Sequence, residues 1–200
     1  MSNKVMDNLL KDFQHFSLHI EEDIAWLTID VKDEAANVIS PEVVAELDKA
    51  CDEVAKLNVK GMILLSGKSS GFIAGADVKK FRELTDPKEA RAFVDTGHAT
   101  CKKLEDLSIP TVAMVEGFCM GGGLEVALSC DYIIVDDAPS TKLSLPEVKL
   151  GIHPGFGGTV RSIRKIGVMQ AMPMMLTGKN ILPRQAKKIG LADMLSLIHI

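Results

Sequence analysis

The sequence predicts an α/β protein whose strands run largely parallel to one another. Short runs of β-branched and aliphatic residues alternate along the chain with longer segments that carry apolar residues at helical spacing. This alternation is typical of a parallel sheet whose strands are joined by helices. The 200 residues, of which 46% are hydrophobic, suffice to bury one core, so we expect one domain.

The first elements are a predicted hairpin and a capped helix. Residues 16–20 and 24–29 contain β-forming residues and are separated by three acidic residues, as two strands joined by a tight turn would be. Ser40 is the expected N-cap of the following helix, and Pro41 is its first residue. Apolar residues at helical spacing continue this helix to Leu57.

The middle of the chain predicts a strand, a loop and a second helix before the next strands. The compact apolar run 62–65 is typical of a buried strand, and a loop rich in Gly and Ser follows at residues 66–77. Asp86, which a proline follows, predicts the start of the second helix. Residues 111–115 and 132–135 are the next strand candidates.

The C-terminal part predicts short helices and ends in an unusual tail. Glycine and proline residues divide residues 154–190 into short helical segments. The last residues form a strongly apolar run with no cap, charge or turn after it. We therefore expect a domain at residues 1–194 that is incomplete at its C-terminus, and a non-native tail at residues 195–200.

Composition and charge exclude several classes of function. The formal net charge of -4 argues against nucleic-acid binding, which rests largely on Lys and Arg side chains. There is no uncharged apolar run of about 18 residues or more, so we expect no transmembrane segment. The N-terminus lacks the features of a secretion or transit signal, and we expect a cytoplasmic protein. The four Cys and five His residues show no metal-ligand spacing, so we expect no metal site.

A run of three glycines in residues 118–130, FCMGGGLEVALSC, precedes an apolar helical segment that contains one acid, Glu125. One interpretation is a dinucleotide-binding turn, which would bind NAD. Counted from Gly121, the third glycine of that motif would fall at Val126, whose side chain opposes close packing of the helix on the strand. A phosphate-binding loop that ends in SGKSSG is excluded, because five residues separate Gly61 from Gly67 where the motif requires four.

The other interpretation of the glycine run is an oxyanion hole. Glycine amides at a helix N-terminus can approach a ligand closely and stabilise negative charge on it. Glu125 follows within one turn, and Glu147 lies in a second apolar run, so the two acids could act as acid and base. For Glu125 the alternative is a structural acid held by free amides or by an Arg, and for Glu147 it is a loop acid exposed to water.

Four blocks of the sequence carry a resemblance to a known family. They are residues 66–81, 109–132, 143–161 and 176–193. With these blocks the chain resembles the crotonase, or enoyl-CoA hydratase/isomerase, superfamily from about residue 16 to residue 193. The resemblance implies an α/β fold built as a spiral of ββα repeats, here without the family's C-terminal helical part.

The resemblance also implies a set of site residues. In the family two backbone amides form the oxyanion hole, and they correspond here to Ala76 and Gly122. The two glutamates of the family's hydratases correspond to Glu125 and Glu147. The residues expected to bind the substrate and its coenzyme A portion are Lys68, Ala74, Gly75, Ala76, Asp77, Lys79 and Gly121, with Lys80 as a further phosphate contact. The residues interpreted as turn and packing residues are Gly155, Gly157, Gly158 and Arg161.

The implied function is an enoyl-CoA hydratase of fatty-acid β-oxidation, which adds water to trans-2-enoyl-CoA and gives 3-hydroxyacyl-CoA. Because the thioester itself activates the double bond, no cofactor is expected. The alternatives that share the fold are a cis-3/trans-2 enoyl-CoA isomerase and an inactive CoA-binding fragment. The alternative from another class is the dinucleotide-binding module.

The connection between the two glutamates is longer than in single-function members of the family. Glu147 follows Glu125 by 22 positions, with the extra length in VDDAPSTKLSL. A similar connection occurs in the N-terminal hydratase domain of the α subunits of multifunctional fatty-acid oxidation complexes. The implied partners are an acyl-CoA substrate and, in such a complex, a thiolase β subunit, with a homo-oligomer as the alternative. The implied location is the bacterial cytoplasm rather than the mitochondrial matrix, and NAD would belong to a dehydrogenase domain outside this chain.

Overall fold

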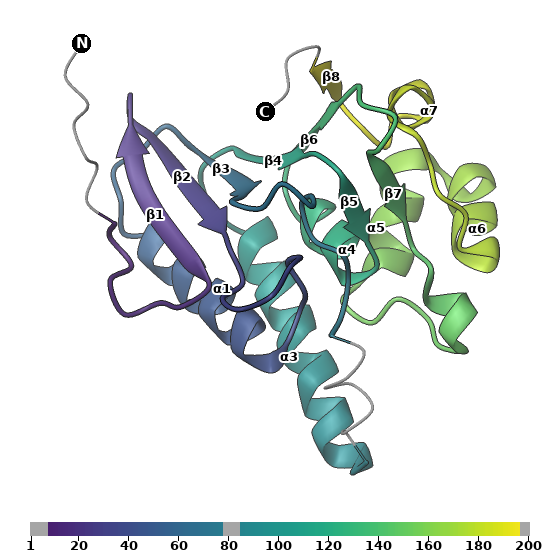
Figure 1. Cartoon of the computed structure of the whole chain (residues 1–200), viewed down its shortest axis with the longest axis horizontal. Coiled ribbons are helices and arrows are strands. Elements are labelled where there is room, and N and C mark those ends of the chain that lie inside the picture. The colour runs from purple at the N-terminus through teal and green to yellow at the C-terminus, as the bar shows by residue number, and fades with distance from the viewer. Residues whose placement is uncertain (1–7, 78–84, 197–200) are drawn as a thin grey trace.

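The computed structural model describes residues 8–77 and 85–196, which form two sheets with helices packed around them (Figure 1). The larger sheet has six strands in the order β1-β2-β3-β4-β6-β8, and the smaller sheet pairs β5 with β7. β1 and β2 form the antiparallel hairpin that the sequence predicts, and the other strand pairs are parallel. The predicted α/β class with largely parallel strands is therefore confirmed.

Apart from β8, the strands of the larger sheet are longer than those of the smaller sheet. Those of the larger sheet are β1 (Phe16–Glu21), β2 (Ile24–Ile29), β3 (Gly61–Ser66), β4 (Thr111–Val115), β6 (Tyr132–Asp136) and β8 (Met194–Ser196). Those of the smaller sheet are β5 (Phe118–Met120) and β7 (Lys142–Ser144).

Two pairs of helices pack together, α1 with α3 and α5 with α6 (Figure 1). The bounds are α1 (Pro41–Val54), α3 (Pro87–Glu105), α4 (Gly122–Ala127), α5 (Gly158–Ile166), α6 (Val168–Thr177) and α7 (Pro183–Ile189), with a 3-10 helix, η1, at Glu147–Leu150. The long helices α1 and α3 pack against each other beside the larger sheet, and α5 packs against α6. Within the described residues no helix is long and apolar enough to cross a membrane.

Local signals set the starts of the two long helices. Ser40 caps α1, since its side-chain oxygen accepts a hydrogen bond from the Val43 amide at 3.3 Å. Asp86 caps α3 in the same way, by accepting from the Lys88 amide at 2.8 Å. The end of α1 differs from the prediction, because the helix stops at Val54 and Leu57 packs against the core from the turn that follows.

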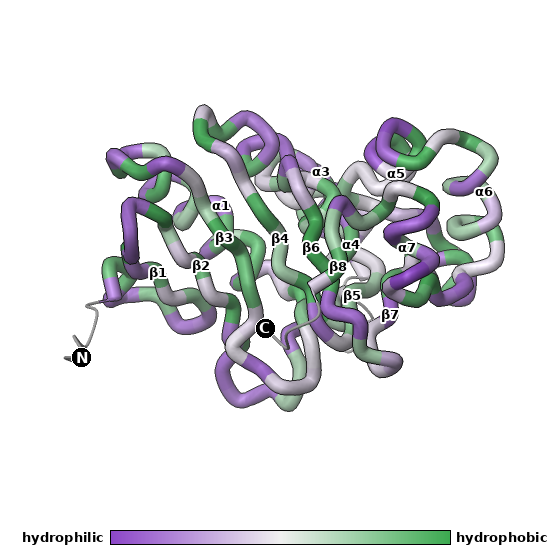
Figure 2. The backbone as a smooth tube through the Cα atoms, turned by 90° about the horizontal axis from the view of Figure 1, so that it is seen from above, coloured by the Kyte–Doolittle hydropathy of each residue, from purple (hydrophilic) through white to green (hydrophobic). Residues whose placement is uncertain are grey.

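One face of the larger sheet forms the core together with α1 and α3. Along β2, Ala25, Leu27 and Ile29 are buried, and the residues between them are half-buried. α1 turns its own apolar stripe toward these residues, Leu47 and Cys51 among them. Figure 2 shows hydrophobic residues concentrated along the central strands β4 and β6, and hydrophilic residues in many of the surrounding loops.

Three short strands, β5, β7 and β8, are not predicted from the sequence. Each has three residues, which is too short for an alternating pattern to appear. In β8, Leu195 and Ser196 of the expected tail pair with Val135 and Asp136 of β6 and extend the sheet. Residues 197–200 lie outside the described residues, and their interpretation as part of a non-native tail stays a prediction.

Candidate active site

The smaller sheet brings the glycine run and Glu147 to the same place. β5 and β7 are parallel, with Met120 paired to Ser144, so the segments that follow them leave the sheet at the same edge. Gly121 comes directly after β5, and its amide donates to the Ser144 carbonyl at 2.9 Å. Glu147 follows β7 at the start of η1. Parallel pairing thus places two regions far apart in sequence beside each other.

A third segment, residues 73–76, joins them along the other side of β5. The Ile73 amide donates to the Phe118 carbonyl at 2.9 Å, and the Met120 amide donates to the Ile73 carbonyl at 2.9 Å. Gly121 shows how close the three segments come. A Cβ added to it would lie 3.2 Å from Oε1 of Glu147 and 3.8 Å from Cα of Gly75, and its φ of +55° favours glycine.

The two amides expected to form an oxyanion hole flank Ile39. The Ile39 amide donates to the Gly75 carbonyl at 2.8 Å, and the Asp77 amide donates to the Ile39 carbonyl at 2.9 Å. In this parallel bridge the Ala76 amide points away from Ile39's backbone. Gly122 is the first residue of α4, where helix amides lack partners within the helix. Within residues 8–77 and 85–196, neither the Ala76 nor the Gly122 amide donates to a protein acceptor.

Glu125 is buried on α4, one turn after Gly122, with 2% of its surface exposed. Its Oε1 accepts hydrogen bonds from the amides of Phe156 and Gly158, both at 2.7 Å. Burial raises the pKa of Glu125, and these backbone hydrogen bonds together with the charge of Arg161 act in the opposite direction. The carboxylate is therefore held in one orientation at the N-terminus of α5.

Glu147 is also buried, with 8% of its surface exposed, but its carboxylate is held differently. Its Oε2 is buried without a hydrogen-bond partner among the described residues. The pKa of Glu147 is raised to about 7, chiefly by burial and also by the charge of Glu125, while a backbone hydrogen bond and His153 act in the opposite direction. The influence of Glu125 on this pKa places the two carboxylates within electrostatic reach of each other.

The structure contradicts the structural alternative for Glu147 but is compatible with that for Glu125. Glu147 lies buried on a 3-10 turn and is not a loop acid exposed to water. Glu125 is held by free amides, as its structural alternative requires, but it also lies on the helix that begins at Gly122. One carboxylate with fixed partners, a second with an unpaired oxygen and two unpaired amides can together polarise a carbonyl and transfer protons.

The residues expected to bind coenzyme A are only partly brought together. Ala74, Gly75 and Asp77 lie on the segment that pairs with residues 37–39. Lys68 is mostly buried and forms an ion pair with Asp30, with Nζ 2.6 Å from Oδ1, so its charge already has a protein partner. Lys79 and Lys80 lie outside the described residues, and their role as phosphate contacts stays a prediction.

The sequence patterns do not predict which residues hold the Glu125 carboxylate. Gly158 and Arg161 are more than the turn and packing residues that the pattern predicts. The Gly158 amide binds the Glu125 carboxylate, and Arg161 Nη1 donates to the Phe156 carbonyl at 2.7 Å, which fixes the loop. The available signal was GFGG directly before a helical segment, because glycines at a helix start offer free amides to an anion.

A second hollow in the molecule lies away from these residues. A cavity of about 480 Å³ is lined by residues of α1, α3 and the turn after α3, including Cys51, Lys103 and Leu107. It contains none of the predicted site residues. Within the described part of the chain, no three His, Cys, Asp or Glu side chains are grouped as they would be around a metal ion.

Comparison with known proteins identifies the family. Residues 19–196 match the sequence profile of the family described as enoyl-CoA hydratase/isomerase. The chain belongs to the enoyl-CoA hydratase/isomerase family. This result confirms the resemblance carried by the four sequence blocks.

The curated proteins similar to this chain include α subunits of fatty acid oxidation complexes. The fatty acid oxidation complex subunit alpha of Aliivibrio fischeri is 42% identical over 175 residues, which are 86% of this chain and 26% of that protein. The protein of the same name from Shewanella amazonensis is 43% identical over 180 residues, which are 89% of this chain and 26% of that protein. The chain thus spans about a quarter of the length of these relatives.

Solved structures of enoyl-CoA hydratases share the fold. The enoyl-CoA hydratase of Geobacillus kaustophilus is 33% identical and superposes with a TM-score of 0.86 over 91% of this chain and 68% of that one. The enzyme from Bacillus anthracis is 31% identical, with a TM-score of 0.85 over 92% of this chain and 70% of that one. These similarities confirm the predicted crotonase fold.

Proposed function

We propose that this protein adds water across the double bond of trans-2-enoyl-CoA thioesters and gives 3-hydroxyacyl-CoA, a step of fatty-acid β-oxidation. The observation that carries the proposal is the pair of buried carboxyls, Glu125 and Glu147, beside the unpaired amides of Ala76 and Gly122. Members of this family with a hydratase activity need both an oxyanion site and an acid and base, and all four groups lie on the three segments that converge at β5.

The two amides would polarise the substrate. In the proposed complex the thioester oxygen accepts hydrogen bonds from the amides of Ala76 and Gly122, which draws electron density away from the β-carbon. Removal of one such donor from an enzyme typically lowers the rate by about 100-fold to 1,000-fold. The lack of protein acceptors among the described residues supports this role, because Ala76 is exposed and Gly122 is half-buried, so that both amides are open to a ligand.

The two carboxyls would then divide the proton transfers between them. Glu125, ionised and oriented by the amides of Phe156 and Gly158, takes a proton from the water that attacks the β-carbon. The electron pair of the double bond moves toward the thioester oxygen, and the α-carbon takes a proton from neutral Glu147. Loss of a proton from Glu125 and uptake of one by Glu147 complete the cycle.

The raised pKa of Glu147 fits its proposed role as the acid. The pKa of Glu147 is raised to about 7, so a substantial fraction of its carboxyl groups carries a proton at neutral pH. Burial, the largest effect, raises the pKa of Glu125 overall, and the amide hydrogen bonds and the charge of Arg161 act against this rise in favour of the ionised form that the base requires. Acids and bases whose pKa lies near the working pH are the most effective catalysts. The proposed steps use only the activation of the thioester and involve no metal or redox cofactor.

Double-bond isomerisation is the second candidate. It requires one carboxyl that removes a proton from one carbon and returns it to another, and Glu147, with its pKa near 7, meets that requirement. Hydration in addition requires a second carboxylate for the water. The burial of Glu125 beside Glu147 therefore favours the hydratase, although both reactions can occur in one site.

The test is a paired assay of the full-length protein with trans-2-enoyl-CoA and cis-3-enoyl-CoA. We expect hydration of the first substrate, and a loss of about 100-fold or more in turnover for both Glu125→Gln and Glu147→Gln with the fold retained. Double-bond migration without any hydration would leave only the isomerase. A titration that detects NAD but no CoA thioester would favour the dinucleotide-binding alternative.

We extend the proposal to the setting of the reaction. The α-subunit relatives are named as parts of a fatty acid oxidation complex, which supports a role of this protein in such a complex in the bacterial cytoplasm. A thiolase β subunit is the partner we propose, and a homo-oligomer is the alternative. Co-purification of the full-length protein from its native host, followed by mass spectrometry, distinguishes the two.

A further inference from the structure

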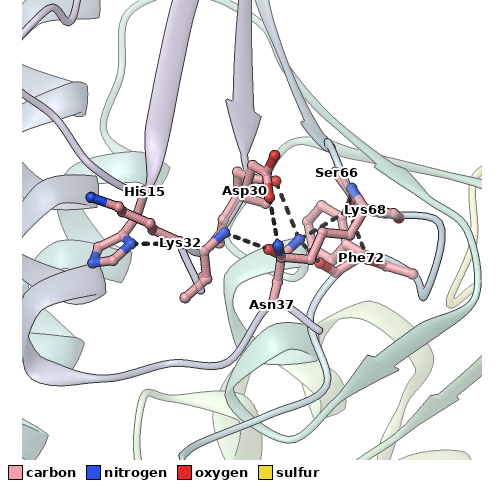
Figure 3. A network of polar contacts seen from close by, with 10 residues as sticks. His15, Asp30, Lys32, Asn37, Ser66, Lys68 and Phe72 are labelled. Atoms are coloured by element: carbon pink, nitrogen blue, oxygen red, sulfur yellow. Dashed lines mark hydrogen bonds and ion pairs between the residues drawn. The ribbon is translucent and has the colours of Figure 1, made fainter. Parts of the chain in front are cut away.

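A buried asparagine, Asn37, joins three parts of the chain near the proposed site (Figure 3). Its side chain is almost completely buried, with 1% of the residue exposed. Nδ2 lies 3.2 Å from the Ile29 carbonyl, 2.9 Å from Ser66 Oγ and 2.9 Å from the Phe72 carbonyl, and Oδ1 accepts from the Val31 amide at 2.9 Å. Two amide protons are thus shared among three acceptors, so both donor positions of the side chain are used, and Oδ1 accepts one hydrogen bond.

The backbone of residues 37–39 holds Ala76, whose amide is the first of the two proposed oxyanion-hole donors. The Asn37 carbonyl accepts from the Ala74 amide at 2.8 Å, and two residues later the backbone of Ile39 bonds to Gly75 and to Asp77. These three bonds fix the chain on both sides of Ala76. The direction of the Ala76 amide therefore follows the position of residues 37–39.

Residues 37–39 also contact Gly122, whose amide is the second proposed donor. A Cβ added to Gly122 would lie 2.9 Å from Cδ1 of Ile39, so the Ile39 side chain packs directly on the start of α4. Ile39 therefore touches both halves of the proposed oxyanion hole, through its backbone on one side and its side chain on the other. Asn37 anchors this segment to the end of β2 and to the loop after β3.

We propose that Asn37 is a positioning residue that sets the Ala76 amide against the Gly122 amide for the thioester oxygen. The inference rests on the proposed function, because it assigns Asn37 a task in that site. A shift of a donor by a fraction of an ångström weakens its hydrogen bond to the developing oxyanion, and small misplacements lower enzyme rates strongly. Asn37 touches no reacting atom and acts through the backbone that it holds.

The decisive variant is Asn37→Asp, which keeps the shape of the side chain and the acceptor for Val31. In its ionised form the new carboxyl lacks both donor protons and places a negative charge against the carbonyls of Ile29 and Phe72; in its protonated form it keeps one donor proton for three acceptors, so a hydrogen bond is lost in either form. We expect kcat to fall by about 10-fold or more, with a much smaller change in KM, because ground-state contacts to the rest of the substrate persist.

A spectroscopic measurement separates positioning from loss of folded protein. The infrared band of a carbon-13-labelled thioester carbonyl moves to lower frequency when the carbonyl accepts strong hydrogen bonds. We expect this displacement for a bound enoyl-CoA in the wild type and a smaller displacement in Asn37→Asp. A reduced fraction of folded protein would lower the amplitude of the band and leave its frequency unchanged.

Asn8 provides a matched control. It too organises backbone through both ends of its amide, since Oδ1 accepts from the Leu10 and Leu18 amides and Nδ2 donates to the Leu10 carbonyl at 3.2 Å. It lies near the N-terminus, against β1, and outside the proposed site. Asn8→Asp should lower thermal stability and leave kcat and the carbonyl frequency at wild-type values.

Each outcome decides the inference. Folded Asn37→Asp with wild-type kcat and carbonyl frequency would overturn it. If Asn37→Asp does not fold, Ser66→Ala takes its place, because it removes one acceptor of Asn37, and we expect about a 3-fold or larger fall in kcat with a smaller displacement of the band; wild-type values there would also refute the inference. A wild type that neither hydrates enoyl-CoA nor displaces the band would instead refute the proposed function.

Discussion

The two buried glutamates differ in their hydrogen-bond partners, and this difference supports the roles proposed for them. Glu125 Oε1 accepts from two backbone amides, whereas Glu147 Oε2 has no partner within the described residues. Hydrogen bonds from amides favour a charged carboxylate, and burial without them favours the neutral acid. Two residues of one type can therefore act as base and as acid in one site.

The raised pKa of Glu147 predicts how activity depends on pH. Its pKa of about 7 lies above the ordinary value, so the acid form needed for proton delivery is present below pH 7 and is lost as the pH rises through 7. We predict that kcat/KM falls above about pH 7 on that account. The measurement is a pH–rate profile of the free enzyme with trans-2-enoyl-CoA. A profile that stays flat or rises from pH 6 to pH 9 would contradict the assignment of Glu147 as the acid.

Arg161 should influence the reaction through Glu125. It donates to the Phe156 carbonyl and pairs with Glu105, and its charge lowers the pKa of Glu125. We predict that Arg161→Met lowers kcat by about 10-fold, less than the loss of a general base itself, and moves the acidic limb of the pH–rate profile to higher pH.

The control for this variant is an arginine in an exposed ion pair. Arg91→Met removes the pair with Asp95 on the surface of α3 and should leave both kcat and the profile unchanged. An acidic limb at its wild-type position in Arg161→Met would show that the arginine only stabilises the fold.

At the scale of elements, the close packing of α4 on residues 73–76 places Glu125 and the Gly122 amide. A Cβ added to Gly123 would lie 2.5 Å from the Ile73 carbonyl oxygen and 2.7 Å from the Ile73 Cβ. Backbone this close leaves no room for any side chain. The glycine run therefore serves helix packing at its third residue, and in the proposed site its second residue gives the ligand access to an amide.

Gly123→Ala tests this packing. Alanine is favoured over glycine in a helix by about 1 kcal/mol, but the contact with backbone forces the helix to move, and overpacking of this kind costs about 1–3 kcal/mol. Since the neighbour is a carbonyl that cannot rotate away, we predict a net loss of stability and of activity. Denaturant unfolding measures the first and the hydration assay the second.

Gly155→Ala is the matched control for stability. A Cβ there would lie 3.8 Å from Val94, an ordinary contact, so the free energy of unfolding should change by less than about 1 kcal/mol. Equal stability losses in the two variants would mean that α4 is not packed as described.

Sequence patterns predict the longer elements of the fold but not the shortest strands. The hairpin, the caps of α1 and α3 and the strands β3, β4 and β6 all follow from residues within a few positions of one another, and they are predicted correctly. The strands β5 and β7 escape prediction because three residues cannot display a period. Yet this short pair decides the site, since its parallel register carries Gly121 and Glu147 to one edge.

At the scale of the whole molecule, the site is assembled from segments that the sequence separates widely. Residues 37–39, 73–77, 121–125, 147 and 156–158 all contribute groups or hold them in place. A ligand that bridges several of these segments stabilises the folded chain as a unit, because it binds the folded state and not the unfolded one.

We therefore predict that a short enoyl-CoA raises the melting temperature. At a concentration of 100 times its Kd, a ligand stabilises the folded state by about 2.7 kcal/mol, which corresponds to about 5–10 °C for a domain of this size. Thermal scans with enoyl-CoA measure the shift, and scans with NAD serve as the comparison. A shift with NAD but none with enoyl-CoA would favour the dinucleotide-binding interpretation of the glycine run.

The sequence by itself determines the fold class, the caps and the family, because periodicity, helix capping and motif spacing are properties of neighbouring residues. Only the tertiary structure reveals that Glu125 is held by the amides of Phe156 and Gly158, that Glu147 Oε2 has no hydrogen-bond partner among the described residues, and that Asn37 anchors the segment beside the two proposed oxyanion-hole amides. These features depend on contacts between distant segments. Such contacts arise when short parallel strands pair and helices pack, and no local pattern records them.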